Sequence, residues 1–146
     1  MAQAHGTREN PAEVVIVGSG PAGYTAAIYT ARAQLEPILY QGSVTAGGAL
    51  MNTTEVENFP GFTAGIMGPE LMDSMRDQAE RFGTKMITDD ITEMELAGSI
   101  KRLVDGSGNE VFAKSVIFGD GFGLSRIRAT RREATLRSWR LLVRYL

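Results

Sequence analysis

The feature that most constrains the fold of this chain is a glycine-rich turn between a predicted strand and a predicted helix. Residues 13–17 are almost continuously apolar and rich in valine, as in a central strand of a parallel sheet. Residues 24–35 are rich in alanine and contain neither glycine nor proline, so they predict a helix. The turn that separates the two segments reads Gly18-Ser19-Gly20-Pro21-Ala22-Gly23.

Each glycine of this turn has a distinct physical task. Gly18 allows the sharp reversal, Gly20 lets the backbone approach a pyrophosphate, and Gly23 lets the helix pack against the strand. The free N–H groups at the start of the helix then point at the phosphates, where the helix dipole favours negative charge. Because the motif lies between a strand and a helix, it predicts dinucleotide binding by residues 18–23. A glycine turn without a ligand is the alternative.

The following segment extends this unit but departs from its usual form. Residues 37–40 are short and apolar and predict a second strand. An acidic residue that binds ribose hydroxyls usually follows such a strand, but this chain has Gln41 there. An amide accepts a hydrogen bond from a hydroxyl more weakly than a carboxylate does. The order strand, glycine turn, helix and strand still predicts an α/β fold, as in the first half of a dinucleotide-binding unit.

The rest of the body is expected to complete the sheet. Residues 42–67 are rich in turn-forming residues and read as a loop, and a helix is expected to open at Gly68-Pro69 and to stop at Gly83. Short strands are expected at residues 85–88, 92–96, 101–104, 111–113 and 115–118, with a turn at 106–109. We therefore predict a Rossmann-like domain with a parallel sheet, covering helices and a small β-meander.

Composition narrows the function classes. The 146 residues include no cysteine, which excludes disulfides and cysteine chemistry within them. His5 is the single histidine and has no companion ligands, so no metal site is expected. No apolar run approaches the roughly twenty residues of a membrane span, and residues 1–10 do not resemble a secretory signal, so a cytoplasmic location is expected. A net charge of −2 gives no argument for nucleic acid or membrane as a partner.

Charge is nevertheless divided unevenly along the chain. Residues 124–146 contain seven arginines and one acidic residue, Glu133. Because the whole chain has 15 basic and 17 acidic residues, the first 123 residues carry 8 basic and 16 acidic ones. An acidic, glycine-rich body is thus followed by a short arginine-rich tail.

Four segments of the body, the first of which contains the turn, resemble the N-terminal FAD domain of bacterial thioredoxin reductase. They are residues 15–33, 47–51 (Gly-Gly-Ala-Leu-Met), 54–61 (Thr-Glu-Val-Glu-Asn-Phe-Pro-Gly) and 68–72 (Gly-Pro-Glu-Leu-Met). The resemblance runs from about Glu13 to Ile117. It implies a flavoenzyme that passes electrons from NADPH through FAD to a disulfide and then to thioredoxin. It also implies a homodimer for the full-length enzyme.

The resemblance assigns site residues by position. The FAD pyrophosphate would be held by Gly18, Ser19, Gly20, Pro21, Ala22 and Gly23, and the adenosine ribose by Gln41 and Gly42. The flavin would be lined by Gly47, Gly48, Ala49 and Leu50, with Asn58 bonding near the isoalloxazine and the backbone of Ile91 meeting the adenine. No catalytic or metal-binding residue is assigned within the chain.

The chain departs from the family pattern in two places. The family's redox Cys-x-x-Cys and its NADPH domain are absent, so we expect no thioredoxin reduction by this chain itself. Gly119-Asp120-Gly121 stands where the family has an Ala-Thr-Gly turn. The expected organisation is a disordered arm over residues 1–12, an incomplete FAD-binding domain over 13–121 and a non-homologous tail over 122–146. Two other readings stay open, a stand-alone flavoprotein like ferredoxin–NADP reductase and an inert fragment.

The tail has a specific interpretation. Synonymous codons exist for residues 130–146, followed by TGA, that read one nucleotide later as Pro-Gly-Glu-Lys-Arg-Leu-Phe-Asp-Arg-Gly-Val-Ser-Trp-Cys-Ala-Thr-Cys. That product resembles the family segment leading into its redox motif. The tail is therefore interpreted as out-of-frame translation. The rival hypothesis is a basic helix that binds nucleic acid or an acidic partner.

Overall fold

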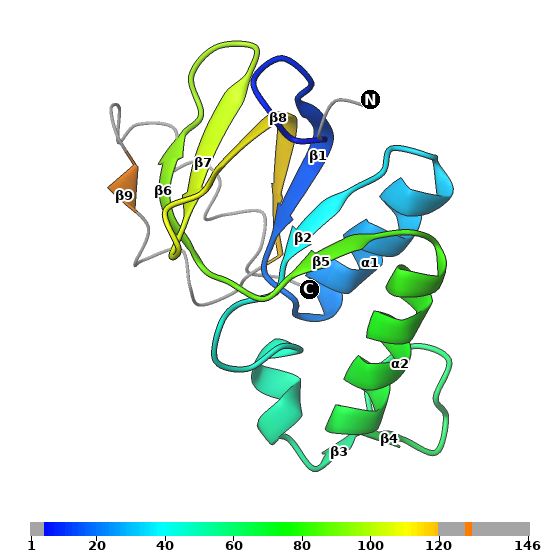
Figure 1. The fold of residues 1–146 in the computed structure, drawn as a ribbon. Coiled ribbons are helices and arrows are strands. Elements are labelled where there is room, and N and C mark those ends of the chain that lie inside the picture. Colours follow the sequence, from blue (N-terminus) through cyan, green and yellow to red (C-terminus); the bar gives the residue numbers. More distant parts are fainter. Residues whose placement is uncertain (1–4, 120–127, 130–146) are drawn as a thin grey trace.

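The computed structural model describes residues 5–119 and 128–129 (Figure 1). Within that part of the chain the helices are α1 (Pro21–Arg32), α2 (Gly68–Arg81) and the short 3-10 helix η1 (Gly48–Asn52). The strands are β1 (Ala12–Val17), β2 (Ile38–Tyr40), β3 (Glu55–Val56), β4 (Ile66–Met67), β5 (Lys85–Ile87), β6 (Ile91–Glu95), β7 (Lys101–Asp105), β8 (Glu110–Phe118) and β9 (Arg128–Ala129).

The main sheet joins a parallel half to an antiparallel half. Its order across the described residues is β5-β2-β1-β8-β7-β6-β9, and β3 and β4 form a separate two-stranded sheet. Strands β5, β2, β1 and β8 run parallel, whereas β8, β7 and β6 form an antiparallel meander. Since β1 sends its crossover through α1 to β2 on one side and pairs with β8 on the other, the strand order reverses at β1. The predicted Rossmann-like α/β fold with a small meander is confirmed.

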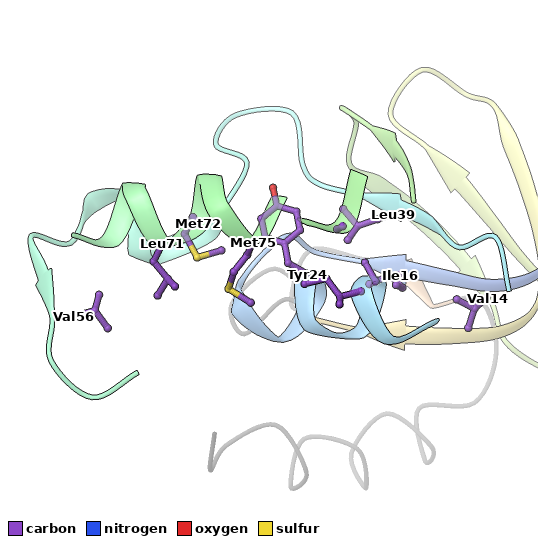
Figure 2. Packing of buried hydrophobic residues seen from close by; sticks show 11 residues of the cluster. Val14, Ile16, Tyr24, Leu39, Val56, Leu71, Met72 and Met75 are labelled. Atoms are coloured by element: carbon purple, nitrogen blue, oxygen red, sulfur yellow. The ribbon is translucent and has the colours of Figure 1, made fainter. Parts of the chain in front are cut away.

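Strand β1 is buried on both faces because each face has its own core. Val14 and Ile16 join a cluster with α1, α2 and Leu39 of β2, and Figure 2 shows its members from these elements. Val15 and Val17 point to the opposite face and join a cluster formed largely by the meander. Each such side chain stabilises the fold by about 1.5–3 kcal/mol when it leaves water, which explains the uninterrupted apolar run of this strand.

Helix α1 is shifted towards the N-terminus relative to the predicted span of 24–35. It begins at Pro21 because proline at the first helical position has the right φ and has no N–H to leave unsatisfied. It ends at Arg32, and Gln34 and Glu36 then adopt left-handed backbone angles that no helix continues through. Helix α2 opens at Gly68 and is followed by Gly83 at a φ of 94°, as predicted.

The β-rich segments also differ in detail from the prediction. Residues 111–113 and 115–118 form one continuous strand, β8, because Lys114 stays in the ladder and its ammonium pairs with the Glu13 carboxylate of β1 at the surface. The expected loop over 42–67 contains η1, β3 and β4.

Residues 5–12 form an ordered turn and the start of β1, which differs from the disordered arm that was expected. The Gly6 N–H donates to the Asn10 carbonyl at 2.9 Å, and the Gly6 carbonyl accepts from the Phe112 N–H at 2.8 Å. The His5 Nε2 lies 3.0 Å from the Glu36 carbonyl oxygen. The turn therefore caps the sheet, with Gly6 packed between Ile38 and Val111. Residues 1–4 lie outside the described part.

The two described residues of the tail form β9, which pairs in parallel with β6. The remaining tail residues of the predicted 122–146 segment, and Asp120 and Gly121 before it, lie outside the described residues. No helix in the described part of the chain is long and apolar enough to cross a membrane.

Candidate dinucleotide site

The glycine turn, residues 18–23, lies at the carboxyl end of β1 where the strand order reverses. The Gly18 N–H donates to the Tyr40 carbonyl of β2 at 2.8 Å, and Gly18 has a φ of 103°. On the other side, the Gly119 N–H donates to the Val17 carbonyl at 2.8 Å. Ligands of open α/β sheets bind in the crevice at such a point, so the turn has the position expected of a dinucleotide site.

Backbone packs against backbone within the turn. A Cβ atom on Gly23 would lie 1.9 Å from the Gly18 carbonyl oxygen, far inside any allowed contact. A Cβ on Gly119 would lie 2.5 Å from the Gly23 Cα. At Gly20 the space is less restricted, since a Cβ there would lie 3.3 Å from the Gly119 carbonyl oxygen. The close approach of helix and strand that the sequence predicted at Gly23 is therefore present.

The first turn of α1 presents donors suited to an anion. The first helical hydrogen bond runs from the Tyr24 N–H to the Gly20 carbonyl at 3.0 Å, so the N–H groups of Ala22 and Gly23 precede any carbonyl they could reach within the helix. The Gly20 N-cap has no side-chain hydrogen bond, and the first turn holds no acidic residue. These donors fit a pyrophosphate, as found at other glycine turns.

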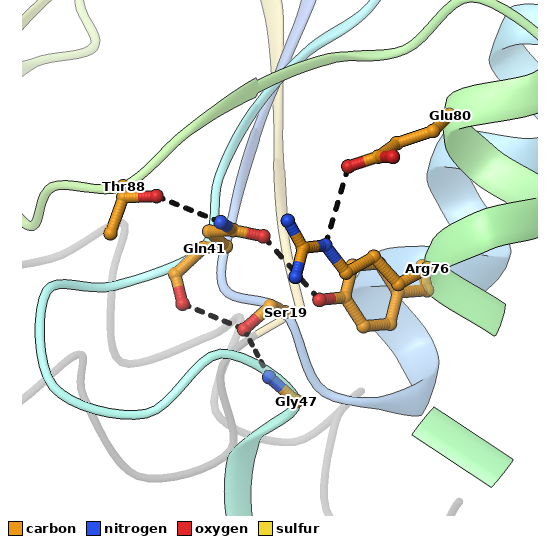
Figure 3. A network of polar contacts seen from close by, with 7 residues as sticks. Ser19, Gln41, Gly47, Arg76, Glu80 and Thr88 are labelled. Atoms are coloured by element: carbon orange, nitrogen blue, oxygen red, sulfur yellow. Dashed lines mark hydrogen bonds and ion pairs between the residues drawn. The ribbon is translucent and has the colours of Figure 1, made fainter. Parts of the chain in front are cut away.

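A buried hydrogen-bond network joins the glycine turn to two other segments (Figure 3). The Ser19 hydroxyl donates to the Gln41 carbonyl at 2.7 Å. The Ser19 hydroxyl oxygen also accepts a hydrogen bond from the Gly47 N–H at 2.9 Å. Ser19 is only 4% exposed. One side chain thus fixes the turn, the end of β2 and the segment predicted to line the flavin.

Gln41 turns its side chain into the protein. Its Nε2 donates to the Thr88 hydroxyl at 2.9 Å, and its Oε1 accepts from the Tyr24 hydroxyl at 3.5 Å. Burial raises the pKa of Tyr24, while the nearby Arg76 guanidinium acts in the opposite direction. Because both ends of the Gln41 amide have partners in the fold, this side chain braces α1 against the end of β5, a role that the sequence analysis missed.

The predicted adenosine side also comes together at the end of β2. The Gly42 N–H donates to the Asp89 carbonyl at 3.2 Å, which brings Gly42 beside the segment that leads into Ile91. The Ile91 side chain is buried in the meander core. The Ser107 hydroxyl donates to the Asp89 carboxylate at 2.7 Å and is the main cause of the lowered pKa of that carboxyl.

The predicted flavin-lining residues lie next to the glycine turn. We call residues 47–50 the flavin segment. A Cβ on Gly48 would lie 3.4 Å from the Gly20 Cα, so the two backbones are in contact. Leu50 and Asn58 line a common pocket of about 430 Å³ together with Thr53, Glu55, Val56 and Glu57. The structure thus brings Leu50 of the flavin segment and Asn58 together at one pocket, while Gly48 contacts the glycine turn.

Helix α2 supports the flavin segment from the other side, which the sequence did not reveal. A Cβ on Gly68 would lie 2.2 Å from the Leu50 carbonyl oxygen, and the Gly68 N–H donates to the Thr54 carbonyl at 2.8 Å. The available signal was the glycine just before Pro69, because a helix start can accept other residues unless another backbone approaches it closely.

Comparison with known proteins identifies the family. Residues 12–136 match the profile described as pyridine nucleotide-disulphide oxidoreductase. The chain belongs to this family. It is 65% identical over 108 residues to a thioredoxin reductase of Streptomyces coelicolor, a match that covers 74% of this chain and 34% of that protein. A Streptomyces clavuligerus thioredoxin reductase is 58% identical over 121 residues, covering 83% of this chain and 38% of that protein.

Solved structures of the same family agree with this assignment. A Lactococcus lactis thioredoxin reductase superposes with a TM-score of 0.69 at 37% identity, covering 84% of this chain and 37% of that one. A Giardia duodenalis thioredoxin reductase gives 0.69 at 32% identity, covering 80% and 35%. The chain therefore spans little more than a third of the relatives that it matches.

Proposed function

We propose that this chain binds FAD as the N-terminal flavin-binding part of a thioredoxin reductase. The observation that carries the proposal is the glycine turn. Gly23 and Gly119 pack against the backbone of the turn without room for a Cβ, and the uncapped N–H groups of Ala22 and Gly23 stand at the start of α1. The identity of 65% to a thioredoxin reductase supports the same conclusion.

Three groups of residues would bind three parts of the cofactor. The pyrophosphate is bound by the backbone of residues 18–23, and the adenosine by Gly42 and the backbone of Ile91, beside the buried Gln41. The isoalloxazine is bound by residues 47–50 and Asn58, and the structure supports this because Leu50 and Asn58 line one pocket. Backbone amides and an uncharged amide side chain can bond the polar atoms of a flavin without introducing a charge. When bound, FAD supplies hydride-transfer chemistry that amino-acid side chains lack.

Reduction of thioredoxin is proposed for the complete enzyme and not for these residues alone. Exchange with a substrate disulfide requires a thiolate, and the 146 residues contain no cysteine. The complete enzyme would take electrons from NADPH, act on thioredoxin, form a homodimer and work in the cytoplasm. The chain's own contribution is to bind and orient the flavin.

The proposal is tested by reconstituting the purified 146-residue chain with FAD. After gel filtration we expect a protein peak that carries flavin absorbance and releases FAD, not FMN, on denaturation. Mixed with NADPH and oxidised thioredoxin, the reconstituted chain is expected to show no thiol production. Loss of all flavin during gel filtration together with unchanged FAD fluorescence on titration would reject FAD binding.

The out-of-frame hypothesis for the tail has a separate test. Sequencing the gene through codon 146 and beyond is expected to show a shifted frame that continues into Cys-Ala-Thr-Cys and a second glycine-rich nucleotide fold. A gene without such a frame would reject the hypothesis and favour a stand-alone FAD-binding protein.

A further inference from the structure

We propose that Ser19 is a positioning residue that sets the flavin segment relative to the pyrophosphate-binding turn. The inference rests on the proposed FAD function and adds a division of labour within it. The Ser19 hydroxyl bonds the Gln41 carbonyl and the Gly47 N–H, whereas the packing of Gly18, Gly23 and Gly119 does not involve that hydroxyl. The side chain at the second position of the turn therefore acts on a neighbouring segment.

The hydroxyl group is suited to this position. It has one proton to donate and two lone pairs to accept with, and the structure uses both functions at 2.7 Å and 2.9 Å. Ser19 and Gly47 are both buried, so water does not replace a lost partner freely. Removing the hydroxyl leaves the Gln41 carbonyl and the Gly47 N–H without this link.

The hydrogen bond with Ser19 reaches the flavin segment at its first residue, Gly47. Its φ of 98° fixes the direction in which η1 leaves, and a Cβ there would lie 2.7 Å from the Met51 Cγ and 3.2 Å from the Met72 Cβ. The methionine side chains thus pack on one side of Gly47, while its N–H is held by Ser19 on the other. Loosening that bond shifts the flavin segment while the turn keeps its own contacts.

The experiment compares ADP with FAD on the full chain, because ADP carries the adenosine and pyrophosphate but no flavin. We expect Ser19→Ala to weaken FAD binding by about tenfold and ADP binding by less than about twofold, as for one lost buried hydrogen bond. Ser19→Thr, which keeps the hydroxyl, is expected to recover most of the FAD affinity. The control is Ser115→Ala, which removes an exposed hydroxyl that donates to the Glu13 carbonyl at 2.6 Å; both affinities should stay unchanged.

A second readout does not depend on a ligand. Amide hydrogen exchange of residues 47–50 is expected to rise about tenfold in Ser19→Ala, while residues 22–24 keep their wild-type rates. Equal weakening of ADP and FAD, or unchanged exchange at residues 47–50, would overturn the inference. Failure of the wild-type chain to bind either nucleotide would instead reject the proposed function, and the exchange data would still decide the role of Ser19.

Discussion

The glycine turn and the flavin segment lie side by side but are held by different means. In the turn, backbone packs directly on backbone, with a Gly23 Cβ position 1.9 Å from the Gly18 carbonyl oxygen. The flavin segment is instead held by side chains and by a neighbouring helix, through Ser19, Met51 and the first residue of α2. A site for a long cofactor can thus combine a rigid anchor for the pyrophosphate with a separately adjustable contact for the reactive ring.

The largest effect is expected from Gly23→Ala. The new methyl group would overlap the Gly18 backbone, and no side chain can move to make room. We expect the free energy of unfolding to fall by about 3–5 kcal/mol, with loss of nucleotide binding. Urea denaturation followed by circular dichroism measures it.

The control for this variant is Gly61→Ala. Gly61 has a φ of 96° and open space around its Cβ position, so alanine there meets backbone strain alone, about 1–2 kcal/mol. If both variants lost the same stability, close packing of the turn would not be what makes Gly23 necessary.

The next effect concerns Tyr40, whose carbonyl accepts from Gly18 at the base of the turn. Burial, followed by the charges of Asp105 and Asp89, raises the pKa of Tyr40 from 10.0 to about 12. Because the pKa is higher in the folded state, the stabilisation is complete below pH 10 and is lost as the pH rises from about 10 to 12. The loss amounts to roughly 3 kcal/mol at 1.36 kcal/mol per pH unit.

Tyr40→Phe is therefore expected to flatten the decline of urea midpoints between about pH 10 and 12 without removing it, since burial also raises the pKa of Tyr24. The matched control is Tyr29→Phe, at a side chain that is 69% exposed. An unchanged alkaline decline in Tyr40→Phe would show that the region under the turn is less dry than its burial indicates.

Gly68→Ala tests the contact between the start of α2 and the flavin segment. Its methyl group would lie 2.2 Å from the Leu50 carbonyl oxygen, but this carbonyl belongs to a half-exposed segment that can move aside. We expect a loss of about 1–3 kcal/mol in stability and a larger weakening of FAD than of ADP. Parallel loss of both nucleotides in titrations would contradict the separation of the two regions.

The smallest effect is expected from Thr84→Val, between α2 and β5. The Thr84 hydroxyl is buried and has no hydrogen-bond partner among the described residues. Valine of nearly the same shape removes this unpaired group, so stability should stay equal or rise by about 1 kcal/mol. FAD affinity should not change. A measured loss of more than about 1 kcal/mol would mean that the hydroxyl has a partner after all.

The local sequence predicted the structure of the glycine turn far better than that of the flavin segment. Local patterns within residues 13–40 predict a buried strand, a glycine turn and a helix, and the structure contains all three. The start of α1 was misplaced by giving Gly23 to the turn, although Pro21 favours the first helical position. Strand β8 was predicted as two strands because the charged Lys114 interrupts its apolar pattern. In the structure Lys114 pairs with Glu13 at the surface and the strand continues.

The inward position of the Gln41 side chain and the bridge made by Ser19 depend on long-range contacts. Ser19 and Gln41 are separated by 22 positions in the sequence, and Gln41 and Thr88 by 47. Such long-range partners leave no periodic signal in a single sequence, because periodicity reports only which face of an element is apolar. The order of residues 5–12 was missed for the same reason, since their partners include Glu36 and Phe112.

The most direct test of the account is a calorimetric titration of the full chain with FAD and, separately, with riboflavin. Riboflavin carries the flavin ring but neither phosphate nor adenosine. If the glycine turn anchors the cofactor, FAD should bind at least about tenfold more tightly than riboflavin, because only FAD reaches the N–H groups at the start of α1. Equal affinities would contradict the account, since binding would then come from the flavin segment alone.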